Sequence, residues 1–248
     1  PDEERRHQRF CVVIPAYREE ARIGGVVAAA ACQCPNVIVV DDGSDDRTAE
    51  EAEAAGATVL RHEENRGKGG ALNTAFAYAR EQGFDAMVTL DADGQHDPAE
   101  IPKFIDAYVR TGIPVLVGNR MGDVEHMPWL RRCTNRFMSW LLSRVMRQYV
   151  ADTQCGYRLY RSDVIPFVSA DAQRFAAESE ILLHVAQRGI RIGSVRISTI
   201  YGSERSKINP FLDTIRFISM LLEHRMLHEK RQRGRSVRRG SARDEGGS

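Results

Sequence analysis

Short apolar segments alternate with amphipathic ones along the first half of this chain, and that alternation limits the fold more than any other feature. Each apolar segment spans only three to five residues and is followed by a polar turn and a stretch with helical spacing. Short buried strands that alternate with helices are typical of βαβ units, whose sheet is mainly parallel and covered by helices. The sequence therefore predicts an α/β fold with strands over 10–14, 36–40, 58–60, 86–90 and 114–117 and helices over 21–31, 48–55, 69–82 and 98–110.

The pattern changes after residue 120. We predict a long helix with a broad apolar face over 129–149, a helix over 175–188, a strand over 190–200 and a last amphipathic helix over 211–227. The residues from 229 on are almost free of apolar side chains, which is typical of disorder. The chain thus divides into an N-terminal extension (1–9), one α/β domain (10–228) and a basic disordered tail (229–248).

Composition excludes several classes of protein. Hydrophobic residues make up 42% of the 248 residues and charged residues 28%, enough apolar material for a sizeable core. No run of more than 18 residues lacks charge, and the one of 18 (23–40) is interrupted by Pro35, so we expect no transmembrane helix; no apolar segment near the N-terminus suggests a signal peptide. The five cysteines are an odd number without CxxC spacing, which favours reduced thiols and a cytoplasmic location over disulfides or zinc.

Charge is distributed unevenly although the net charge is only +1. Residues 225–248 carry eight Lys or Arg against three Asp or Glu, a surplus of five, so residues 1–224 stand at 1 − 5 = −4. A basic end on a mildly acidic body is not the footprint of a nucleic-acid-binding domain, and we expect no nucleic-acid partner.

Three of the predicted strands end in acid-rich turns, at 15–20, 41–46 and 91–96. In an open α/β sheet, ligands bind beyond the carboxyl ends of the strands. Asp45, Asp46 and Asp97 are explained as caps of the helices that follow them. Asp91 is not, because it stands directly at a strand end, and with Asp93 it offers hard oxygen ligands suited to Mg²⁺ or Mn²⁺ carrying a diphosphate.

A glycine-rich segment at 65–71 opens the third predicted helix and could cradle a phosphate at the helix N-terminus. It is not a Walker A loop, because Lys68 is followed by Gly69 and not by Ser or Thr, and it is not a GxGxxG motif. These departures argue against an ATPase and against a dehydrogenase.

Taken in order, these segments resemble the family-2 inverting glycosyltransferases with a GT-A fold, and most of all the polyprenyl-phosphate (dolichyl-phosphate) mannose and glucose synthases. The segments that carry the resemblance are VIPAYRE (13–19), VVDDGS (39–44), NRGKG (65–69) and DADGQH (91–96). Three later segments agree with it: GNR (118–120), DTQCGYR (152–158) and SK (206–207). The resemblance spans residues 10–210 approximately and implies a GT-A domain within residues 10–228.

The resemblance implies a role for each matching residue. Asp93 and Gln95 would ligate Mg²⁺ or Mn²⁺, and Asp93, Arg120 and Glu180 are the expected catalytic residues. The nucleotide-sugar would be bound by Pro15, Ala16, Tyr17, Glu19, Asp42, Lys68, Asp91 and Ala92. The acceptor phosphate would meet Arg120, Arg132, Arg205 and Lys207.

The class of acceptor depends on whether a general base is present. A hydroxyl acceptor needs one, whereas a phosphomonoester, whose second pKa is about 6, is already ionised at pH 7. Glu178-Ser179-Glu180 is the only acidic candidate for a base in the region where related enzymes carry one, and it is equally well explained as the first turn of a helix. We therefore predict metal-dependent transfer of a hexose from a UDP- or GDP-sugar to a polyprenyl phosphate. The alternative is transfer to a hydroxyl of a soluble or glycan acceptor with Glu180 as base.

Two predicted helices, 129–149 and 211–227, combine an apolar face with flanking arginines or a basic tail. This combination is typical of a protein that lies on an anionic membrane surface, and it predicts peripheral attachment to the inner face of the plasma membrane. The same apolar faces are also compatible with packing on the core or in a homo-oligomer.

Overall fold

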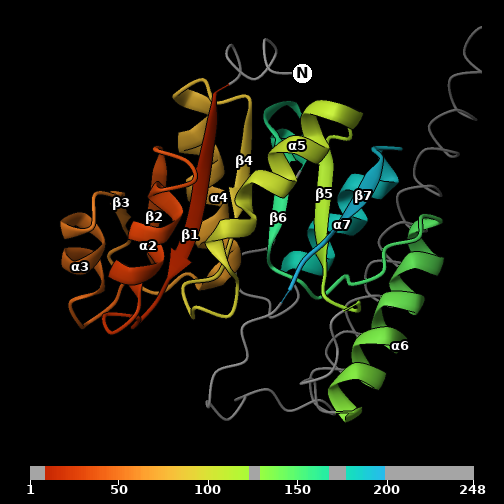
Figure 1. The fold of residues 1–248 in the computed structure, drawn as a ribbon, viewed down its shortest axis with the longest axis horizontal. Coiled ribbons are helices and arrows are strands. Elements are labelled where there is room, and N and C mark those ends of the chain that lie inside the picture. The colour runs from red at the N-terminus through yellow and green to blue at the C-terminus, as the bar shows by residue number, and fades with distance from the viewer. Residues whose placement is uncertain (1–8, 123–128, 168–176, 199–248) are drawn as a thin grey trace, which may run out of the picture. The chain divides into compact units, whose positions relative to one another are not determined.

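A seven-stranded sheet organises the part of the chain that the computed structural model describes, residues 9–122, 129–167 and 177–198 (Figure 1). The strand order is β3-β2-β1-β4-β6-β5-β7, and only β6 runs antiparallel to its neighbours β4 and β5. The predicted mainly parallel α/β sheet is confirmed. The strands are β1 (Phe10–Ala16), β2 (Val37–Asp41), β3 (Thr58–Arg61), β4 (Ala86–Thr89), β5 (Val115–Asn119), β6 (Arg158–Arg161) and β7 (Ile192–Arg196).

Helices connect these strands at boundaries close to the predicted ones. The expected helix over 98–110 begins as a 3₁₀ turn because Pro98 and Pro102 follow the N-cap Asp97, whose carboxylate accepts the N–H of Ala99. The helices are α2 (Ile23–Ala31), α3 (Thr48–Ala54), α4 (Gly67–Glu81), η1 (Pro98–Glu100), α5 (Ile101–Thr111), α6 (Trp129–Met146), η2 (Ser162–Phe167) and α7 (Ala177–Gln187).

The core lies on both faces of the sheet. Every residue of β2 and β4 is buried, as continuous apolar strands between two helical layers should be. Side chains alternate across a strand, so Tyr157 and Tyr160 point to opposite faces. The ring of Phe104 in α5 stacks on Tyr157 at 4.6 Å between centroids, and Phe76 in α4 meets Tyr160 edge-on at 5.2 Å. These contacts place α4 and α5 on opposite faces of one core.

One strand was not predicted, the predicted end of one helix needs correction, and two predicted segments lie outside the described residues. Strand β6 was not predicted, because its four residues begin and end with arginine and carry no alternation long enough to recognise. Helix α6 ends at Met146 because the next residue, Arg147, has a left-handed backbone with φ 56°. The predicted helix over 211–227 and the tail over 229–248 lie outside the described residues.

Within the described ranges, no helix is long and apolar enough to cross a membrane. All five cysteines are free thiols, as predicted, and Cys11, Cys34 and Cys155 are buried.

The connections decide where a ligand can bind. From β1 the chain moves to β2 and β3 on one side, and then returns to place β4 on the other side of β1. The crevice beyond the carboxyl ends of β1 and β4 is therefore the topological switch point of the sheet, where open α/β folds bind their ligands.

Candidate active site

A hollow of about 370 Å³ lies at this switch point. Its wall comes from the turns that follow β1, β2 and β4 and from the start of α4. All the residues predicted to bind the nucleotide-sugar line it, together with Asp93: Pro15, Ala16, Tyr17, Glu19, Asp42, Lys68, Asp91 and Ala92. What they bind stays a prediction, but the fold brings four separate segments to one place.

The turn after β1 is fixed by the turn after β2. The N–H of Arg18 donates to Ser44 Oγ at 2.9 Å, and the N–H of Glu19 donates to Thr48 Oγ1 at 2.8 Å. Arg18 adopts a left-handed backbone, φ 56°, which is uncommon outside glycine. The side chain of Tyr17, 41% exposed, borders the hollow beside this turn.

Asp42 is held in place before any ligand arrives. Its Oδ1 accepts hydrogen bonds from the backbone N–H of Arg66 at 2.9 Å and from His62 Nδ1 at 2.7 Å. The other ring nitrogen of the buried His62 lies 2.8 Å from Thr74 Oγ1. The turn that follows Asp42 needs Gly43, which has φ 74° and would place a Cβ 2.7 Å from the backbone carbon of Glu64.

Lys68, in the wall of the hollow, joins two carboxylates. Its Nζ lies 2.5 Å from Asp91 Oδ1 and forms a second ion pair with Glu178 in the first turn of α7. Burial acts to lower the pKa of Lys68, but the charges of Asp91 and Glu178 outweigh it and raise the pKa above its ordinary value. Gly156 packs against this cluster, because a Cβ there would lie 2.8 Å from Asp91 Oδ2 and 2.9 Å from Glu178 Oε1.

The strand-end carboxylate Asp91 is also fixed through its backbone. Its N–H donates to Nδ1 of the buried His96 at 3.3 Å. Burial lowers the pKa of His96, and the nearby Asp91 offsets only part of this effect, so the ring is neutral and accepts at Nδ1. Burial alone would raise the pKa of Asp91, but the charges of Lys68 and, to a smaller extent, Arg120 hold that pKa below its ordinary value.

Of the two acidic residues in the first turn of α7, the structure pairs Glu178 with Lys68, and the role predicted for Glu180 stays a prediction. Glu178 lies next to the hollow without lining it: it pairs with Lys68, which is part of the wall, and lies against Gly156. Glu180, two residues on, is turned about 200° around the helix from Glu178. The sequence could not distinguish them, because the phase of a helix depends on where it packs, and α7 packs against α6 and β7.

The two predicted metal ligands are placed differently. Asp93 lines the hollow, and its Oδ1 accepts the backbone N–H of Gln95 at 2.9 Å, whereas Gln95 is not among the residues of the wall. In the described part of the chain, no three Asp, Glu, His or Cys side chains stand close enough to cage a cation. Mg²⁺ and Mn²⁺ on nucleotides commonly use only one or two carboxylates together with phosphate oxygens. Asp91 and Asp93 therefore fit a cation that arrives with a diphosphate, and not one held by protein alone.

The predicted acceptor residue Arg120 is not an open guanidinium. It is 6% exposed, and its Nε and Nη2 donate to the two oxygens of the buried Asp152 at 2.7 and 3.0 Å. Arg158, which ends the segment that begins at Asp152, is fully buried as well. It donates to the backbone carbonyls of Cys155, Thr153 and Glu178 at 2.7, 2.8 and 2.6 Å, which ties the Gly156 segment to the first turn of α7.

Two exposed arginines lie instead on α6 itself. Arg132 and Arg136 line a second hollow, of about 390 Å³, together with Met121, Trp140 and Tyr149. Met121 follows Arg120 directly, so this hollow borders the carboxyl end of β5. Of the remaining predicted acceptor residues, Arg205 and Lys207 lie outside the described residues.

Comparison with known proteins identifies the family. Residues 11–172 match glycosyl transferase family 2. The chain belongs to that family. It is 33% identical to the UDP-N-acetylglucosamine–dolichyl-phosphate N-acetylglucosaminyltransferase of Methanococcus voltae, with 77% of this chain and 85% of that one covered. It is 30% identical to the undecaprenyl-phosphate mannosyltransferase of Micrococcus luteus, with 77% and 84% covered. This family-2 chain is therefore a glycosyltransferase.

A comparison with solved structures supports the fold expected for this family. Glucosyl-3-phosphoglycerate synthase from Mycobacterium tuberculosis, in complex with Mn²⁺, UDP and phosphoglyceric acid, superposes with a TM-score of 0.70 at 22% identity, over 89% of this chain and 80% of that one. The likeness confirms the expected GT-A fold of the family-2 enzyme.

Proposed function

We propose that this glycosyltransferase moves a hexose from a UDP- or GDP-sugar to a polyprenyl phosphate, with Mg²⁺ or Mn²⁺ on the diphosphate of the donor. One observation carries the proposal: the molecule has an acid-lined hollow at the switch point and an arginine-lined hollow at the end of β5. Relatives named as dolichyl-phosphate and undecaprenyl-phosphate transferases support the acceptor. The complex of the synthase with Mn²⁺ and UDP supports the donor and the cation.

On the donor side, the chain supplies fixed groups at both ends of a nucleoside diphosphate. Asp42, already oriented by His62 and Arg66, accepts hydrogen bonds from the base. Lys68 stays charged because its pKa is raised, and its ammonium lies where the diphosphate would enter. Asp93, with Asp91 beside it, would hold the cation. When bound, that cation stabilises the negative charge of the leaving nucleoside diphosphate.

On the acceptor side, a phosphate oxygen needs no deprotonation. A phosphomonoester is mostly dianionic at pH 7, so it can attack the sugar carbon from the face opposite the diphosphate without a general base. Arg132 and Arg136 bind this dianion through charge-assisted hydrogen bonds. The rings of Trp140 and Tyr149, which line the same hollow, give the prenyl stem an apolar contact.

A hydroxyl acceptor is the second candidate, and one observation favours it. The carboxylate of Glu178 pairs with Lys68, which lines the donor hollow, and would serve as the base in place of Glu180. We place this candidate second because Glu178 is paired with Lys68, and that pair must break before Glu178 can take a proton.

The test is transfer of label from a panel of radiolabelled UDP- and GDP-hexoses to a polyprenyl phosphate in detergent micelles. We expect label in the organic phase with one of the donors, in the presence of Mn²⁺ or Mg²⁺, and its loss on addition of EDTA. Label that enters the organic phase equally well with EDTA would contradict the role of the cation. No transfer from any hexose donor would contradict the proposal as a whole.

A further inference from the structure

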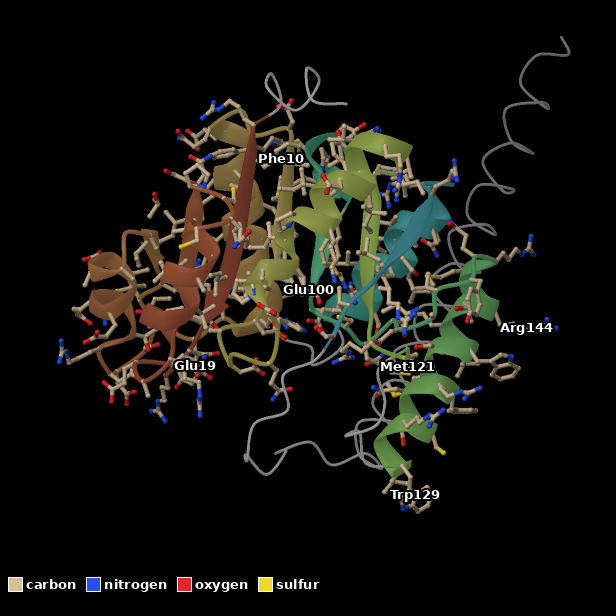
Figure 2. All side chains as sticks on the ribbon, viewed as in Figure 1. Phe10, Glu19, Glu100, Met121, Trp129 and Arg144 are labelled. Atoms are coloured by element: carbon tan, nitrogen blue, oxygen red, sulfur yellow. The ribbon has the colours of Figure 1, made fainter. Side chains whose placement is uncertain are left out.

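Helix α6 presents an apolar face that nothing in the described part of the chain covers. Of the seven large apolar side chains that are exposed there, six lie between residues 129 and 149. Trp129 is 75% exposed and Trp140 59%. Leu130 and Phe137 lie on the same side of the helix, opposite Met138, Leu142 and Met146, which are buried. Figure 2 shows Trp129 and Arg144 at the two ends of α6, directed away from the sheet.

The charge on this face has a single sign. Helix α6 contains four arginines and no acidic residue, and Arg147 follows it directly. The side chains of Arg132, Arg136, Arg144 and Arg147 are exposed, and no described carboxylate pairs with any of them. An apolar face with basic residues around it is the pattern of a helix that lies in the interface of an anionic membrane.

A third hollow, of about 590 Å³, adjoins this face at the end of α6. Trp140, Arg144, Arg147 and Tyr149 line it. The segment after the helix is held in place by Gln148, whose side chain donates to the carbonyl of Ile190 at 2.9 Å and accepts the N–H of Ile192 at 3.1 Å. Two arginines and two aromatic rings on a fixed segment suit an anionic lipid headgroup with the start of its acyl chains.

We propose that α6 and the segment that follows it, through Tyr149, dock the protein on a bilayer of anionic phospholipids, with the side chains of Trp129, Leu130, Phe137 and Trp140 in the interface. Charge favours this occupant over a second copy of the chain. A symmetric dimer through α6 would bring arginines against arginines. Docking goes beyond the proposed transfer reaction, because it requires neither donor nor acceptor.

The tryptophans offer a local measurement, since the two in the chain both lie in α6. Full-length protein is titrated, without substrates, with phosphatidylcholine vesicles that contain either no anionic lipid or phosphatidylglycerol. We expect a blue shift of tryptophan emission and quenching by brominated lipid with the anionic vesicles only, and weaker binding at high salt. If the protein binds anionic vesicles without either change, α6 is not the docking element. If sedimentation velocity instead shows a dimer with blue-shifted emission before lipid is added, the face belongs to a second copy.

Variants separate the apolar contribution from the charge. Trp129→Ser combined with Phe137→Ser should weaken partitioning to anionic vesicles by roughly ten-fold or more, with Trp140 left as reporter. Arg144→Glu should weaken it by roughly ten-fold, because about 1 kcal/mol per basic residue is lost and a repulsive charge is added. Arg110→Glu, the same change on an exposed residue of α5, is the matched control and should have little effect. Equal loss in Arg144→Glu and Arg110→Glu would reduce the effect to net charge and overturn the proposed site. An unchanged melting temperature checks that each variant folds.

Discussion

The hollow at the switch point, which we assign to the donor, and the region between β5 and α7 differ in the sign of their charged side chains and in how those side chains are held. In the donor hollow, acidic side chains stand at strand ends and accept hydrogen bonds from backbone N–H groups: Asp42 from that of Arg66, Asp93 from that of Gln95. In the second region, basic side chains are divided into two sets. Arg120 and Arg158 are buried and bound to the protein itself, whereas Arg132 and Arg136 remain exposed in a hollow. Motif position alone therefore predicts which acids line a hollow far better than which arginines do.

Among substitutions in the donor hollow, Asp93→Ala should have the largest effect on transfer. Loss of this carboxylate removes the cation's stabilisation of the leaving group, worth several kcal/mol, so we expect kcat to fall by about 10³ or more with the fold intact. Steady-state kinetics with saturating Mn²⁺ measures it. Asp97→Asn, a change on the same loop that retains a capping side chain, is the control and should stay near wild type. Activity of Asp93→Ala within a few-fold of wild type would remove Asp93 from the mechanism.

Breaking the buried pair in the second region should act on stability. Arg120→Ala leaves Asp152 as an uncompensated buried carboxylate, and we expect the free energy of unfolding to fall by about 3–5 kcal/mol. Urea denaturation followed by circular dichroism measures it. The double variant Arg120→Met/Asp152→Leu should recover much of the loss, because neither charge remains buried alone. A stable but inactive Arg120→Ala would instead return Arg120 to the acceptor phosphate.

The two acids of α7 make a matched pair that decides which of them acts in transfer. Glu178→Gln should lower transfer by roughly 10–100-fold, since a charge-assisted contact with Lys68 is worth about 1.5–3 kcal/mol. Glu180→Gln, the same change two residues further on, should stay within a few-fold of wild type. Relative kcat/KM for the two variants with one acceptor decides between them. The reverse order would restore Glu180.

The smallest effect should be on binding alone. Asp42→Asn keeps an oxygen for the N–H of Arg66 but removes the charge that we assign to the nucleotide base. We expect KM for the sugar nucleotide to rise roughly ten-fold with kcat changed little, the pattern of an interaction made equally in ground and transition states. A large fall in kcat at unchanged KM would place Asp42 at the reacting centre.

The outcome of sequence-based prediction follows the same division between the two regions. The strands that carry the donor site are continuous apolar runs, and their polar turns follow at once, so both the α/β fold and the wall of the hollow could be predicted. Asp97 caps η1 as predicted, and Asp46 accepts the N–H of Thr48, but Asp45 pairs with Arg18 instead. That pair joins two turns distant in sequence, which local pattern does not reveal.

In the second region, prediction failed where long-range packing sets the answer. Strand β6 is held by pairing with β4 on one side and β5 on the other. Arg158 can be buried because four acceptors surround its guanidinium. The phase of α7, which brings Glu178 to Lys68, is fixed by its neighbours. None of these facts has a local signature in the sequence.

The central claim is that the nucleophile is a phosphate, and one comparison of acceptors tests it. A polyprenyl phosphate labelled with ³²P and the unphosphorylated polyprenol of the same length are each incubated with the tritiated donor and Mn²⁺. We predict one product that carries both tritium and ³²P, and no tritiated product from the polyprenol. Comparable transfer of tritium to the polyprenol would show that the enzyme activates a hydroxyl, and would contradict the account.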